Sequence, residues 1–175
     1  MENIKENKNV SVKTKNLVTA ALMAAITCLV TGYILHIPVG NGYVHIGDAI
    51  IYLSASILPL PYALVCGAIG AGLADFTTGA FIWVIPTVII KPLSALFFSS
   101  KSDRIITVRN VIAAFLGGVI GTALYMLADG IIFGNMKAAF VLTGIGLIQP
   151  VGSFIVYIIL GVVLDKVGFK KFYME

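Results

Sequence analysis

Long apolar stretches, each followed by a few polar or glycine-rich residues, make up most of this chain. Six of them have the pattern of apolar helices, and we expect helices at residues 17–37, 48–58, 62–76, 80–98, 109–132 and 137–167. A helix needs about 20 mostly apolar residues to cross a bilayer, so the second and third are short for a full crossing. The pattern predicts an all-α integral membrane protein with six transmembrane helices, in which residues 1–16 form a polar tail and residues 17–175 a single domain.

The composition supports a membrane protein. Of the 175 residues, 59% are hydrophobic and 11% are charged, whereas a soluble domain is about 45–50% apolar and about 25% charged. This argues against a water-soluble enzyme, and it excludes a disordered chain because disorder requires low hydrophobicity. Six helices use almost the whole length, so we expect any extramembrane domain to come from another polypeptide.

Basic residues indicate the orientation. Ten of the 12 Lys and Arg residues fall in the N-terminal tail, in the segment 99–109 or at the C-terminus. These segments share one side of the membrane if the six helices alternate in direction. Cytoplasmic segments carry such an excess of positive charge, so we place both termini in the cytoplasm. The cations flank apolar runs and have no aromatic residues between them, so we expect no nucleic-acid binding.

Small residues recur at helical spacing in three of the predicted helices. Glycines in the third and fifth helices predict close packing between helices of this chain, at positions Gly67, Gly70, Gly72, Gly117 and Gly121. The first helix carries two overlapping pairs, Ala20 with Ala24 and Ala21 with Ala25. This flat face is suited either to packing within the chain or to the docking of another subunit.

Polar groups inside the apolar segments are few, and most fall in the expected outer half of the membrane. Ionisable groups in a span are functional candidates because their burial is costly, and a few polar and aromatic groups in an apolar setting are typical of a small-molecule site. The candidates are Asn41, Tyr43, His45, Asp48, Asp75, Trp83, Thr87, Lys91, Tyr125, Asp129, Asn135 and Gln149.

Several of these residues also have a purely structural interpretation. Asp48 can cap the second helix, and Asp75 and Lys91 can neutralise each other as a buried ion pair. Trp83 can belong to an aromatic belt at the membrane interface, and Gln149 can serve the kink at the proline that follows it. The histidines and cysteines lack metal-ligand spacing, so we expect no metal site and no cofactor.

The sequence contains no P-loop and none of the common hydrolase or metalloprotease motifs. We therefore expect neither an enzyme nor an ATPase. A binding site without an energy source implies partner subunits that supply the energy. The alternatives are a standalone proton-coupled carrier that uses Asp75 and Asp129, and a small intramembrane enzyme, for which no reactive pair is evident.

Four stretches carry a resemblance to a known family, residues 19–25, 42–49, 70–75 and 89–93. In order and spacing they resemble the substrate-binding S components of energy-coupling factor (ECF) vitamin transporters, of the type that binds riboflavin, pyridoxine or hydroxymethylpyrimidine. The resemblance implies a multi-pass protein of a prokaryotic plasma membrane that binds a vitamin from outside. It also implies a transmembrane coupling subunit and two cytoplasmic ATPases as partners.

The resemblance further implies where each partner binds. The coupling subunit docks on Ala20, Ala21, Ala24 and Ala25, and the S component then reorients in the membrane with its substrate. The vitamin site maps to the first outer loop, with two glycines beside Asn41 that suit a hinged lid, and to helices four to six. Because Trp and Tyr rings offer stacking faces and the polar groups can bond ring nitrogens and hydroxyls, we favour hydroxymethylpyrimidine or pyridoxine, with riboflavin second.

Overall fold

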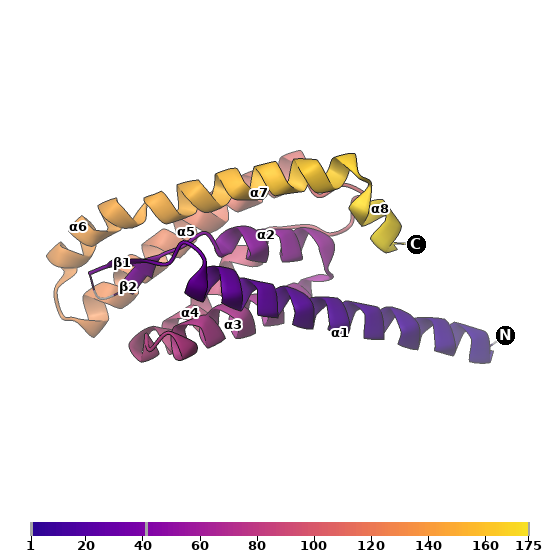
Figure 1. The fold of residues 1–175 in the computed structure, drawn as a ribbon, viewed down its shortest axis with the longest axis horizontal. Coiled ribbons are helices and arrows are strands. Elements are labelled where there is room, and N and C mark those ends of the chain that lie inside the picture. The colour runs from indigo at the N-terminus through magenta and orange to yellow at the C-terminus, as the bar shows by residue number, and fades with distance from the viewer. Residues whose placement is uncertain (1, 41, 175) are drawn as a thin grey trace.

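A computed structural model describes residues 2–40 and 42–174 as a bundle of helices with one small hairpin (Figure 1). Asn41 lies outside the described residues. The elements are α1 (Glu2–Tyr33), β1 (Ile37–Val39), β2 (Gly42–Val44), α2 (Asp48–Ile57), α3 (Leu60–Thr77), α4 (Phe81–Ala95), α5 (Val108–Ile132), α6 (Met136–Gly146), α7 (Ile148–Lys166) and α8 (Phe169–Met174).

The all-α class and all six predicted helical segments are confirmed, with three differences. The first helix begins at Glu2, within the residues predicted as a polar tail, and ends at Tyr33 instead of Ile37. The last segment is divided into α6 and α7, which meet at Leu147 and lie nearly in line in Figure 1. Pro150 has no N–H to donate to the carbonyl four residues before it, which weakens the helix at this point. The loop after α1, predicted to face outward, is an antiparallel hairpin in which Ile37 pairs with Val44 and Val39 with Gly42.

Four helical stretches are long and apolar enough to cross a membrane. They are Ser11–Tyr33, Leu60–Thr77, Val108–Ile132 and Met136–Lys166. The third predicted helix, which the sequence pattern made short, is thus long enough, whereas α2 and α4 are shorter apolar helices. The prediction of six full crossings stays a prediction.

The two chain ends lie at the same end of the bundle, and the hairpin lies toward the other (Figure 1). The basic segment after α4 joins the end with the termini, because Asp165 of α7 accepts hydrogen bonds from the N–H groups of Ile105 and Ile106 at 2.7 and 2.9 Å. At this end α8 also reaches α1, where the Tyr173 hydroxyl donates to Asn16 Oδ1 at 2.8 Å. The three basic segments therefore lie at one end, in agreement with the predicted topology, whereas Lys91 and Lys137 lie elsewhere.

The shortest of the core helices, α2, is enclosed on every side. All ten of its residues are buried, and it contacts α1, α3, α4 and α7. The outer helices instead expose large apolar side chains such as Leu22, Ile85 and Phe115, as expected for surfaces that face lipid. Its N-terminal residue, Asp48, lines the cavity described below.

Glycines in α3 and α5 let neighbouring helices approach closely, which confirms the predicted packing within the chain. A Cβ atom added at Gly70 would lie 2.6 Å from the Ala24 carbonyl oxygen of α1. One added at Gly117 would lie 2.5 Å from the Ser94 carbonyl oxygen of α4, and one at Gly121 would lie 3.0 Å from Ser94 Oγ. These contacts hold α4 and α5 together beside the candidate site.

Candidate functional site

A partly open cavity of about 170 Å³ lies among the hairpin, the start of α2 and parts of α3 to α7. It occupies the half of the bundle away from the chain termini. The sequence-predicted candidates that line it are Tyr43, His45, Asp48, Asp75, Trp83, Thr87, Lys91, Tyr125, Asp129 and Gln149. Elements far apart in the sequence thus bring ten candidates to one cavity.

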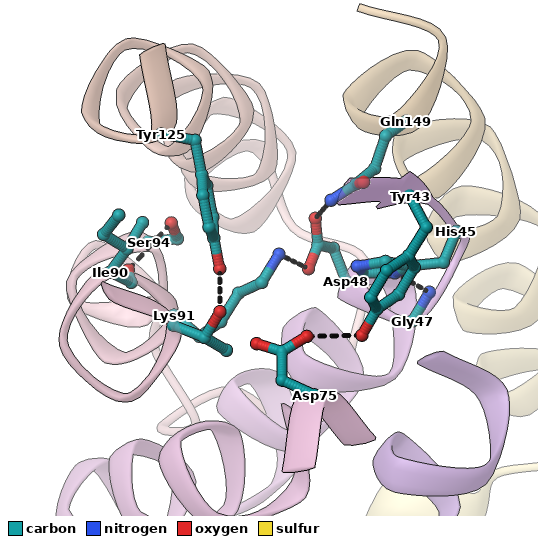
Figure 2. Close-up of polar contacts among 11 residues, drawn as sticks. Tyr43, His45, Gly47, Asp48, Asp75, Ile90, Lys91, Ser94, Tyr125 and Gln149 are labelled. Carbon is teal, nitrogen blue, oxygen red and sulfur yellow. Dashed lines mark hydrogen bonds and ion pairs between the residues drawn. The ribbon is translucent and has the colours of Figure 1, made fainter. Parts of the chain in front are cut away.

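The floor of the cavity is a buried ion pair between α4 and α2. The Lys91 ammonium lies 2.5 Å from Asp48 Oδ1, and Gln149 Nε2 of α7 donates to Asp48 Oδ2 at 2.9 Å (Figure 2). Asp48 is therefore not the cap of α2; Gly47 occupies that position without a side-chain hydrogen bond. The alternative interpretation in which Lys91 pairs with Asp75 is also wrong, because the ion pair of Lys91 is with Asp48.

Asp75, at the end of α3, faces the hairpin instead. The Tyr43 hydroxyl of β2 donates to Asp75 Oδ1 at 2.5 Å (Figure 2), and burial together with the negative Asp75 raises the pKa of Tyr43. The Tyr43 ring stacks on His36, with centroids 3.9 Å apart. Asp75 Oδ2 is buried and accepts no hydrogen bond from the described residues.

His45 follows β2 and is buried beside the ion pair. The Gly47 N–H donates to His45 Nδ1 at 3.0 Å, which places the proton of a neutral imidazole on Nε2. Burial and the positive Lys91 lower the pKa of His45 to about 3, so the ring is neutral at physiological pH. Gly47 has no room for a side chain, because a Cβ atom there would clash with Thr31.

Aromatic side chains form one wall of the cavity. Trp83 and Tyr125 face each other with ring centroids 6.1 Å apart, and the Tyr125 hydroxyl lies 2.7 Å from Thr87 Oγ1. Trp83 is buried and lines the cavity beside Gly42, which contradicts its interpretation as an interfacial belt residue. The Lys91 ammonium lies 5.0 Å from the centroid of the Tyr125 ring, in a cation–π contact.

One candidate lies away from this cavity, and several lining residues were not predicted. Asn135 is exposed and caps α6, with its Oδ1 accepting from the Ala138 N–H at 3.0 Å. The sequence analysis did not consider hydroxyl side chains within apolar helices, and these would have indicated four further lining residues, Thr31, Ser94, Thr122 and Thr143. The described residues contain no group of three or more His, Cys, Asp or Glu side chains that could hold a metal ion.

The family model described as ECF-type riboflavin transporter, S component, matches residues 11–167. The chain belongs to this family. It is therefore a membrane-embedded S component, a substrate-binding subunit for vitamin uptake, and its family is one of transporter subunits and not of enzymes. Comparisons with curated proteins and with solved structures gave no match.

The S component family implies an ECF module of membrane and ATPase subunits, and the sequence predicted the alanine face of α1 as the docking surface for it. Ala20 and Ala24 are buried, at 6% and 8% exposure, and they turn toward the interior of the bundle. Ala21 and Ala25 are exposed. Of the four predicted docking residues, these two are the ones that a partner can reach in this arrangement.

Proposed function

We propose that this S component binds a vitamin or vitamin precursor with a single aromatic ring, such as hydroxymethylpyrimidine or pyridoxine. The size of the cavity carries the proposal. Its volume of about 170 Å³ is close to that of an apolar protein cavity of about 150 Å³ that accommodates one benzene molecule. Aromatic rings on one wall and polar groups on the floor suit a flat ring with polar edges.

The polar groups offer both kinds of hydrogen bond. Lys91 has three N–H donors and uses one of them on Asp48. Asp75 Oδ2 and Thr31 Oγ1 are buried and make no hydrogen bond with the described residues. A ring nitrogen could accept from Lys91 while an amino or hydroxyl substituent donates to Asp75. Asp129 of α5 and Gln149 of α7 are the remaining polar side chains that we propose as hydrogen-bond partners of the ligand.

Riboflavin is the second candidate, and the family description favours it. Its three fused rings exceed a cavity that suits one ring, so binding would require the hairpin to move outward. Gly40 lies at the hairpin tip with φ +57° and rests against Leu142 of α6. A glycine at such a position allows a tight turn, and displacement of this turn would enlarge the mouth of the cavity.

The identity of the ligand tests the proposal directly. The protein is purified without added vitamin, and any small molecule that it retains is identified by native mass spectrometry. Titration calorimetry then compares hydroxymethylpyrimidine, pyridoxine and riboflavin. We expect a single-ring compound to bind most tightly, while tighter binding of riboflavin would contradict the proposed substrate. Absence of binding to any of them would contradict the proposed function.

We also propose that energy comes from an ECF module with two ATPases, to which α1 docks through Ala21 and Ala25, and that the termini face the cytoplasm of a prokaryotic cell. Copurification of an ATP-hydrolysing complex with the tagged protein would support this proposal. Vitamin transport by the isolated chain in vesicles with a proton gradient would instead favour a standalone carrier.

A further inference from the structure

The charges that line the cavity do not balance. The described lining residues include three carboxylates, Asp48, Asp75 and Asp129, one ammonium, Lys91, and no arginine. His45 adds no charge, since its pKa of about 3 keeps it neutral. The cavity therefore carries an excess of negative charge although the whole chain has a net charge of +4.

The one lysine is already neutralised. Lys91 and Asp48 form their ion pair with side chains that are 5% and 11% exposed, so solvent screens it weakly. Gln149 occupies the other carboxylate oxygen of Asp48, which keeps the carboxylate directed at the ammonium (Figure 2). Lys91 can still donate hydrogen bonds, but it offers a ligand little net positive charge.

Asp75 is left as a buried acceptor. The residue is 5% exposed, Tyr43 satisfies one of its oxygens, and the other has no hydrogen bond from the described residues. An acceptor left unsatisfied in a buried place costs free energy that a donor can recover. A ligand that supplies an N–H or O–H at this point would recover it.

We propose that the site selects a neutral or cationic ligand that donates a hydrogen bond to Asp75, and that it rejects the phosphate ester of the same ligand. This inference rests on the proposed function and adds the charge state of the substrate. A phosphate ester would bring its negative charge next to carboxylates in a water-poor cavity, and like charges in such a place repel strongly. The unphosphorylated ring meets no such repulsion.

The test compares each ring compound with its phosphate monoester on the purified full-length protein. Titration calorimetry at pH 7.5 would use hydroxymethylpyrimidine, pyridoxine and riboflavin as the ring compounds. We expect the ester of the compound that binds best to bind at least about a hundredfold more weakly. Equal binding of the two forms would overturn this inference and leave the proposed function standing. Binding of neither form would overturn both.

Two variants locate the effect. Asp75→Asn keeps an oxygen for the Tyr43 hydroxyl but removes the acceptor and the charge, so the unphosphorylated compound should lose about tenfold to a hundredfold in affinity. The difference in affinity between the unphosphorylated compound and its ester should become smaller at the same time. Unchanged affinities in Asp75→Asn would overturn the inference. Asp103→Asn, an exchange of the same kind at an exposed loop residue, is the matched control and should bind like the original chain.

Asp48→Asn exposes the positive charge of Lys91 and should improve binding of the ester relative to the unphosphorylated compound. A structural role of Asp48 alone would weaken both forms equally, and that result would overturn the part given to Asp48. Because this variant leaves Lys91 buried without its partner, it can fail to fold. The comparison on the original chain and on Asp75→Asn decides the inference without it.

Discussion

The ion pair between Lys91 and Asp48 determines how the residues around the cavity are arranged. Its two side chains and Gln149 connect α4, α2 and α7 at one point. Removing one partner of a buried pair typically costs about 3–5 kcal/mol, whereas replacing both by apolar residues is often neutral. We therefore assign the pair a structural consequence, which is a lysine held at a fixed place with its charge balanced.

His45 gives a prediction about pH. Its pKa is lowered to about 3 in the folded protein, compared with about 6.5 in an unfolded chain. Between these values the unfolded chain binds the extra proton, so this residue makes unfolding easier as the pH falls. In His45→Asn the amide oxygen can still accept from the Gly47 N–H, but the titratable group is gone. We expect the melting temperature to fall less steeply from pH 6.5 to 4.5 in the variant, measured by scanning fluorimetry. Identical slopes would contradict the buried neutral imidazole.

Close crossings at glycine organise the helices. Gly70 brings α3 against the backbone of α1, while Gly117 and Gly121 bring α5 against α4. In lipid, where apolar burial drives helix association weakly, close van der Waals contact of this kind is the main attraction. The positions of Asp75 on α3 and Lys91 on α4 therefore depend on these small residues, two of which, Gly117 and Gly121, also line the cavity.

Gly70→Ala tests these crossings. The added Cβ would lie 2.6 Å from the Ala24 carbonyl oxygen and 2.7 Å from Thr27 Cβ, and backbone cannot move aside cheaply. Overpacking costs about 1–3 kcal/mol, so the melting temperature should fall. Gly144→Ala in α6 is the control: its Cβ would meet nothing within 4 Å, and it should stabilise the helix by about 0.5–1 kcal/mol. A Gly70→Ala protein as stable as the original would show that the α1–α3 crossing is looser than described.

The helices could be predicted because each apolar run is long and bounded by glycine, proline or charge. The division at Leu147 was hidden, since both sides of it are equally apolar. The hairpin was hidden as well, because three-residue strands such as Ile37–Val39 carry too short a pattern. The rule that polar residues in or beside apolar runs are candidates identified ten residues that line the cavity. It did not identify the hydrogen-bond or ion-pair partner of each one. Lys91 and Asp48 are 43 positions apart, and only the packing of α2 against α4 brings them together.

The molecule has two different ends. One holds both chain termini and the basic segment, and the other holds the hairpin and the cavity (Figure 1). The long helix α1 runs from the first end to the hairpin and exposes Ala21 and Ala25 along its course. A partner that docks on these alanines would therefore contact the protein away from the cavity, so docking and vitamin binding can be separated by mutation.

Replacing Ala21 and Ala25 together by Trp should abolish vitamin uptake in cells and copurification of the ATPases. Vitamin affinity should stay within about twofold of the original, a change of less than about 0.5 kcal/mol. Val119→Trp, at an exposed apolar position on α5, is the control and should transport normally. A parallel loss of binding and uptake in the alanine variant would contradict the proposed docking face. Trp at the buried Ala24 should instead disturb the packing of α1 on α3 and lower stability.

The enclosure of α2 separates the cavity floor from the surrounding lipid. A change in bilayer thickness acts first on the side chains that lipid touches, and those belong to the helices around α2. Since all ten residues of α2 are buried and Lys91 is buried as well, the ion pair of the floor is shielded from the outer surface of the bundle. Vitamin affinity should therefore be nearly the same in thin and thick bilayers.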